Sequence, residues 1–127
     1  MMKTCNLPQE PPHFIPISLS RIQQILLEKN LTALFETYYF TEIDSTQRFL
    51  KEAAPQNRAI CCAEKQTAGR GRFGRMWHSP FGENIYLSLS YPHVSTLQDL
   101  SGLSLVVSLA AHNCLKSFLP DNQLEIK

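Results

Sequence analysis

The chain has 127 residues, 43% of them hydrophobic, and a formal net charge of +1. This length corresponds to about one domain, and the composition is ordinary for a globular protein with a core. A charge so near zero argues against a general nucleic-acid or membrane-surface binder, so any basic site must be local.

The N-terminal residues contain four prolines by position 16 and no apolar run, which argues against a signal peptide. No stretch approaches the roughly 20 apolar residues that a membrane helix needs. The four cysteines form no C-x-x-C pair, and neither they nor the four histidines recur at metal-ligand spacing. We therefore expect a cytoplasmic protein with reduced thiols, no protein-held metal and no membrane partner.

The first elements follow a proline-containing arm. Residues 1–17 are expected to be extended and loosely held. A capping box at Ser20 predicts a helix that continues to about Lys29. The aromatic and β-branched residues 37–43 then predict a strand.

A second helix and a second strand come next. Asp44 or Ser45 can cap a helix that Pro55 ends. Residues 58–64 (RAICCAE) predict a buried strand.

The last third begins with the clearest strand, residues 85–91, in which apolar and polar side chains alternate. A capping signal at Thr96 leads into an apolar helix over residues 100–118, which Pro120 closes. Residues 123–127 begin a further strand. The sum is an α+β pattern around a β-sheet.

Between two of the predicted strands lies the loop TAGRGRFGRMW, residues 67–77. Its glycines let the backbone approach a ligand, and their amides can converge on an anion. Its arginines carry planar charged groups that match carboxylates and phosphates, and in an extended stretch Arg70 and Arg72 point the same way. The loop therefore predicts an anion site. An arginine-glycine segment that binds RNA, or a solvated hairpin without function, are the alternatives.

The chain carries three separated motifs: IDST at residues 43–46, AEKQTAGRGRFGRMW at residues 63–77 and SPFGENIYLS at residues 79–88. Their order and spacing resemble the catalytic domain of biotin protein ligases. The resemblance implies a mixed β-sheet flanked by helices, of the kind shared with class II aminoacyl-tRNA synthetases. It also implies a ligase that joins biotin and ATP into biotinyl-5′-AMP with Mg²⁺ and transfers biotin to a lysine of biotin carboxyl carrier protein.

The resemblance further assigns roles to single residues. Positions that match biotin or biotinyl-AMP contacts are Ser45, Thr46, Gln66, Gly69, Arg70, Arg72, Trp77 and Lys127. Arg72 and Lys127 are the expected catalytic residues, and Gly71, Gly74 and Arg75 support the loop. Structural alternatives stay open: Ser45 and Thr46 can simply cap a helix, Gln66 can bond the loop backbone, Trp77 can belong to the core, and Arg75 can pair with Glu64 or Glu83.

The chain departs from the family pattern at two places. Gln47 stands where an asparagine commonly follows the Ser-Thr pair, and the sequence stops at Lys127, before the Trp-Pro-Asn-Asp that follows this lysine in the family. We expect residues 1–36 to be an arm and linker helix without a winged helix-turn-helix and without DNA binding. Residues 37–127 are expected to be a truncated catalytic domain, weakly active or inactive alone. Lipoate–protein ligase is the alternative enzyme, and the resemblance allows a homodimer of a full-length protein.

Overall fold

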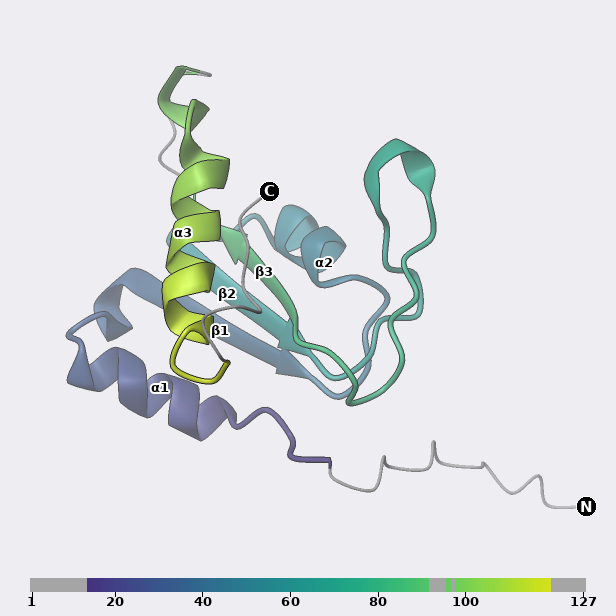
Figure 1. Ribbon diagram of the computed structural model, residues 1–127, viewed down its shortest axis with the longest axis horizontal. Coiled ribbons are helices and arrows are strands. Elements are labelled where there is room, and N and C mark those ends of the chain that lie inside the picture. The colour runs from purple at the N-terminus through teal and green to yellow at the C-terminus, as the bar shows by residue number, and fades with distance from the viewer. Residues whose placement is uncertain (1–13, 92–95, 97, 120–127) are drawn as a thin grey trace, which may run out of the picture. The chain divides into compact units, whose positions relative to one another are not determined.

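The computed structural model describes residues 14–91, 96 and 98–119. Contacts divide the chain into two compact units, residues 1–92 and residues 93–127. The described part of the first unit holds a mixed sheet of three strands with helices α1 and α2, and that of the second holds helix α3 (Figure 1).

The sheet has the order β1-β2-β3, with β1 at Phe35–Phe40, β2 at Arg58–Ala63 and β3 at Tyr86–Ser90. β1 and β2 are parallel and β2 and β3 are antiparallel, which confirms the expected mixed α+β architecture. β2 and β3 agree with prediction to within one residue at each end. β1 ends three residues earlier than predicted, because the chain bends after Phe40 before it pairs again at Ile43.

Helix α2, Thr46–Ala53, covers one face of the sheet. Its Leu50 packs with Ala59 and Cys61 of β2 in a buried cluster, to which the rings of Tyr38, Phe40 and Phe49 are added. Of the two expected caps, Ser45 is the one used, and the helix ends at Ala54 in the left-handed conformation, directly before Pro55. The packing of α2 on β2 and β3 thereby places the N-terminus of α2 beside the ends of those strands.

Helix α1, Leu19–Glu28, contacts β1 on the opposite face, where Gln23 donates a hydrogen bond to Thr37 Oγ1 (3.2 Å). The predicted cap at Ser20 is wrong. Ser18 caps the helix, because its hydroxyl accepts from the Arg21 amide (3.2 Å) and the helical backbone begins two residues earlier than the capping box suggests.

The segment that precedes α1 is also held more firmly than expected. The Ile17 amide donates to the buried Glu64 side chain (2.6 Å), and the Phe14 ring lies 4.8 Å from the Phe81 ring. The expectation of a loosely held arm is therefore wrong for residues 14–17, while residues 1–13 lie outside the described part of the chain.

In the second unit, α3 spans Leu103–Leu115 and begins after Gly102, whose φ is 81°. The predicted start at residue 100 is wrong, because residues 98–100 form a separate turn of 3₁₀ helix. Across the described residues no helix has both the length and the apolar character needed to cross a membrane. The strand expected at residues 123–127 and the stop at Pro120 fall outside the described residues.

Candidate functional site

The site lies just beyond the C-terminal ends of β1 and β2, where the two segments pair again. Ile43 bridges to Gln66, the Thr67 amide donates to Ile43 O (2.9 Å), and the Ala68 amide donates to Asp44 O (2.8 Å). These bonds align the residues that begin α2 with those that begin the arginine-glycine loop. Motifs about 20 positions apart in sequence thus become neighbours.

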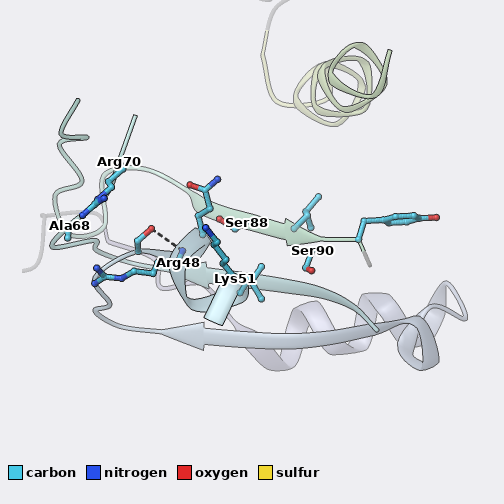
Figure 2. Close-up of a pocket in the computed structure, with 11 residues that line it drawn as sticks. Arg48, Lys51, Ala68, Arg70, Ser88 and Ser90 are labelled. Atoms are coloured by element: carbon cyan, nitrogen blue, oxygen red, sulfur yellow. Dashed lines mark hydrogen bonds between the residues drawn. The ribbon is translucent and has the colours of Figure 1, made fainter. Parts of the chain in front are cut away.

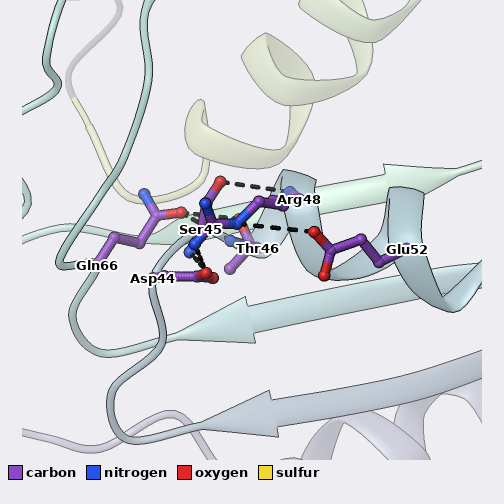
Figure 3. Close-up of polar contacts among 6 residues, drawn as sticks. All are labelled: Asp44, Ser45, Thr46, Arg48, Glu52 and Gln66. Atoms are coloured by element: carbon purple, nitrogen blue, oxygen red, sulfur yellow. Dashed lines mark hydrogen bonds and ion pairs between the residues drawn. The ribbon is translucent and has the colours of Figure 1, made fainter.

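The N-terminus of α2 contributes two buried hydroxyl side chains. Ser45 and Thr46 are 6% and 3% exposed. Ser45 Oγ accepts from the Arg48 amide (3.3 Å), so Ser45 has the structural role of a helix cap. The Arg48 guanidinium pairs with Asp44 and, one turn on, with Glu52 (Figure 3).

Gln66 connects this helix end to the loop. Its Oε1 accepts from the Thr46 amide (2.9 Å) and from Thr46 Oγ1 (3.1 Å), as Figure 3 shows. Its Nε2 donates to Ser79 Oγ (3.4 Å), which in turn donates to Trp77 O (3.4 Å). Gln66 therefore bonds side chains as well as backbone, and it ties α2 to the segment that leaves the loop.

Ser88 of β3 is a functional candidate that the sequence analysis did not single out. Its Oγ lies 2.8 Å from Thr46 Oγ1. Because the Thr46 hydroxyl hydrogen is already donated to Gln66, Ser88 must be the donor in this pair, which leaves its lone pairs available. Two sequence signals covered this position, the alternation along β3 and the motif at residues 79–88 that ends at Ser88, but neither singled out its side chain. Ser88 is half-buried, whereas the flanking Leu87 and Leu89 are 51% and 56% exposed.

Gly69 is the most crowded of the three loop glycines. A β-carbon added there would lie 3.0 Å from Ser79 Oγ, 3.2 Å from Gln66 Nε2 and 3.3 Å from Trp77 O. At Gly71 the nearest atom would be Trp77 Cε3 at 3.4 Å, an ordinary contact. A larger residue at position 69 would therefore displace the Gln66 and Ser79 side chains.

Beyond Gly69 the loop is a narrow hairpin rather than an extended stretch. The Trp77 amide donates to Gly69 O (2.9 Å) and the Gly71 amide to Arg75 O (2.8 Å). Residues Arg72–Gly74 then form a 3₁₀ turn in which Phe73 takes φ 59°. The backbone is extended through Arg70 and Gly71 and turns from Arg72 on.

A cavity of about 590 Å³ joins these groups. Its lining comprises Ser45, Thr46, Gln47, Gln66, Arg70, Gly71, Arg72, Trp77, Ile85, Tyr86, Leu87 and Ser88. We call it the loop cavity. It brings together most of the predicted substrate-binding residues, and Gln47, the departure from the family pattern, is exposed beside it.

A second cavity, of about 650 Å³, adjoins the first along α2. Figure 2 shows Arg48, Lys51 and Arg70 around it, with Ser88 and Ser90 of β3. Among the described residues no carboxylate lines either cavity, and Arg70 and Arg72 form no ion pair. Unpaired guanidinium groups in this setting favour the binding of an anion.

The remaining predicted residues have separate places. Trp77 is 61% exposed, so the alternative that it belongs to the core is wrong. Arg75 lines neither cavity and, within the described chain, pairs with neither Glu64 nor Glu83. Gly74 lies at the hairpin turn with φ 73°. Lys127 falls outside the described residues.

The two adjacent cysteines of β2 are unsuited to nucleophilic chemistry. Cys61 is fully buried, and this burial raises the pKa of its thiol to about 11. Burial likewise raises the pKa of Cys62. Thiols in such surroundings stay protonated near neutral pH and are inert, so the chemistry of the site falls to the loop and its neighbours.

A mixed sheet whose strand ends carry an amide–hydroxyl network and an arginine-glycine hairpin is suited to binding an anion beside a neutral polar group. A family model described as the biotin/lipoate A/B protein ligase family matches residues 39–127. The chain belongs to this family. Together with the relatives and solved structures described next, this match confirms the resemblance found in the sequence and the fold class.

Within the family the likeness is to biotin protein ligases. The bifunctional ligase/repressor BirA of Escherichia coli (strain K12) is 36% identical over 110 residues, which are 84% of this chain and 33% of the relative. BirA of Salmonella typhimurium is 41% identical over 81 residues, 62% of this chain and 25% of the relative. The chain thus spans about a quarter to a third of these relatives.

Solved structures give the same result. The chain is similar to the biotin protein ligase from Aquifex aeolicus in complex with biotin and ATP, with a TM-score of 0.55 and 33% identity over 65% of this chain and 34% of that one. It is also similar to the biotin protein ligase from Leishmania major in complex with biotinyl-5-AMP, with a TM-score of 0.54 and 31% identity over 66% of this chain and 35% of that one. The alternative of a lipoate ligase is not favoured by these relatives.

Proposed function

We propose that this chain carries the biotin-binding half of a biotin protein ligase site, which forms biotinyl-5′-AMP from biotin and ATP and passes biotin to a lysine of biotin carboxyl carrier protein. The observation that carries the proposal is the loop cavity, where the Thr46–Gln66–Ser88 network and two unpaired arginines line one space. The solved relatives hold biotin, ATP and biotinyl-5-AMP, which supports the choice of ligand.

The polar network suits the ureido head of biotin, which has two N–H donors and one carbonyl acceptor. The lone pairs of Ser88 can accept one N–H, as follows from the direction of the Thr46–Gln66 hydrogen bond. The Ser45 hydroxyl hydrogen is free to donate to the carbonyl, because Ser45 is an acceptor in its cap. Trp77, exposed at the edge of the cavity, is placed to cover an apolar ring on binding.

The arginines suit the chemistry that follows. Adenylation requires a biotin carboxylate oxygen to attack the α-phosphorus of ATP, forming the C–O–P anhydride while the bond to pyrophosphate breaks. Two anions must therefore be held together. One guanidinium at ~4 Å from an anionic oxygen contributes about 4 kcal/mol at an effective dielectric near 20. Arg70 and Arg72, both in the lining, together offset the repulsion between the carboxylate and the phosphate.

Mg²⁺ prefers carboxylate and phosphate oxygens. Within the described residues, no group of three His, Cys, Asp or Glu side chains could hold a metal, and the lining residues of the two cavities supply no carboxylate. This part of the chain does not fit a protein-bound Mg²⁺. Accordingly we assign the ion no ligand here and derive no step through it.

The test is titration calorimetry of the purified chain with biotin and, separately, with lipoate, which lacks the ureido group. Biotin should bind more tightly. Ser88→Ala should then weaken biotin binding about five- to tenfold, the effect of one neutral hydrogen bond. Ser90→Ala is the matched control, because Ser90 lies on the same strand and lines only the second cavity.

Adenylate formation is assayed in parallel with ATP labelled at the α-phosphate. Preference for lipoate, or equal loss of biotin affinity in the two serine variants, contradicts the proposal. Tight and salt-sensitive binding of a labelled RNA oligonucleotide with no affinity for biotin would favour the nucleic-acid alternative.

A further inference from the structure

Glu64 is a buried carboxyl side chain that the proposed chemistry does not use. It is 2% exposed, follows the last residue of β2, and lies two positions before Gln66. Burying a carboxyl group is costly unless its oxygens are hydrogen-bonded. The partners of this side chain therefore indicate its role.

Both partners of the carboxyl group come from distant parts of the chain. Its Oε1 accepts from the Ile17 amide (2.6 Å) and from the Tyr39 hydroxyl (2.9 Å). Burial, together with this hydrogen bond, raises the pKa of Tyr39, so the phenol remains a donor at neutral pH. The side chain thus joins the segment before α1 to two strands of the sheet.

The backbone of Glu64 also forms hydrogen bonds with two other segments of the chain. Its amide donates to Phe40 O (3.1 Å), and its carbonyl accepts from the Gly82 amide (2.9 Å). The Gln66 amide donates to Ser79 O (3.3 Å), so residues 64–66 and 79–82 are two hydrogen-bonded segments that lie side by side. Residues 14–17 contact both segments, through Glu64 and through the Phe14–Phe81 ring contact.

We propose that Glu64 is a positioning residue of the site: by fastening residues 14–17 to the end of β2, it holds the backbone that carries Gln66. Attachment of this segment and occupancy of the loop cavity are then coupled, because both require the same position of Gln66 relative to Thr46 and Ser79. The expected effect on biotin affinity rests on the proposed function, whereas the role of Glu64 in positioning Gln66 does not. Whatever displaces residues 14–17 therefore weakens the site without touching the ligand.

The experiment removes the donor and leaves the buried carboxyl in place. Ile17→Pro deletes the amide hydrogen that Glu64 accepts. Ile15→Pro is the matched control, since Ile15 is 88% exposed, precedes another proline and has no hydrogen bond among the described contacts. Amide exchange of Thr67, whose amide is bonded to Ile43, is followed by NMR without ligand, with the Cys61 amide of β2 as the reference for global opening.

Ile17→Pro should accelerate Thr67 exchange about tenfold relative to Cys61 and raise the biotin dissociation constant about tenfold, because a hydrogen bond to a carboxyl group is lost. Ile15→Pro should change both by less than about twofold. Glu64→Gln keeps an acceptor oxygen and should leave Thr67 exchange slow. Glu64→Leu should accelerate Thr67 exchange as Ile17→Pro does, and adding Ile17→Pro to Glu64→Leu should then have no further effect.

Exchange at Thr67 that is unchanged in Ile17→Pro, or accelerated equally at Thr67 and Cys61, overturns the positioning role. A wild-type chain that binds no biotin contradicts the proposed function instead, and the exchange measurement still decides the role of Glu64. Loss of Thr67 protection without any change in biotin affinity overturns the coupling.

Discussion

The substitution Gly69→Ala probes the packing on which the site depends. The new β-carbon would lie 3.0 Å from Ser79 Oγ and 3.2 Å from Gln66 Nε2, so both side chains must move and their mutual hydrogen bond (3.4 Å) is disturbed. Overpacking of this kind costs about 1–3 kcal/mol. Because the displaced Gln66 also bonds Thr46 at the cavity wall, we expect biotin affinity to fall by about one order of magnitude.

Gly71→Ala is the control, since its β-carbon would meet no atom closer than 3.4 Å. Biotin affinity is measured by titration calorimetry, and stability by thermal unfolding, for both variants. Although Gly71 also lines the loop cavity, Gly71→Ala should stay within about threefold of the wild type, because the added β-carbon makes only ordinary van der Waals contacts. Equal affinities for the wild type and Gly69→Ala, or an equal loss in both variants, would refute the crowding argument.

Four further predictions concern the loop and the thiols. In a completed chain, Arg72→Ala should lower adenylate formation about a hundredfold, by analogy with the removal of one transition-state donor. Arg75→Ala, outside both cavities, should stay within about threefold, and the reverse order in a steady-state assay contradicts the assignment. Residues 67–77 should be mobile without ligand, because fixing a glycine-rich backbone costs entropy, and should gain amide-exchange protection when biotinyl-5′-AMP binds. Equal protection with and without the ligand would contradict this ordering. Iodoacetamide at about pH 8 should modify the exposed Cys114 and spare Cys61, as mass spectrometry can show, because burial raises the pKa of Cys61. The unfolded thiol ionises first, so the free energy of unfolding should fall as pH rises from 9.0 to about 11.

Much of the local structure could be predicted from the sequence alone. The strand at residues 58–64, the cap at Ser45 and the stop before Pro55 follow from short-range rules: β propensity, a hydroxyl that accepts from a backbone amide, and the conformational limits of proline. The motifs also identified the family, since three separated segments agree in order and spacing. Such features depend on residues that are close in sequence, which a linear reading can compare.

The tertiary structure decided which side chains form the site and how they are directed. The direction of the Ser88 hydroxyl follows from the hydrogen bond between Thr46 and Gln66. The crowding at Gly69 comes from the close approach of Ser79. The role proposed for Glu64 depends on the Ile17 amide, 47 positions away. None of these contacts has a local sequence signal, because each joins segments whose distance is set by the pairing of β1, β2 and β3. The alternation of β3 likewise predicted a strand but not which of its faces meets α2, because that is set by the pairing of β3 with β2. Ser88 lies toward Thr46 and bonds it, while Leu87 and Leu89 are exposed.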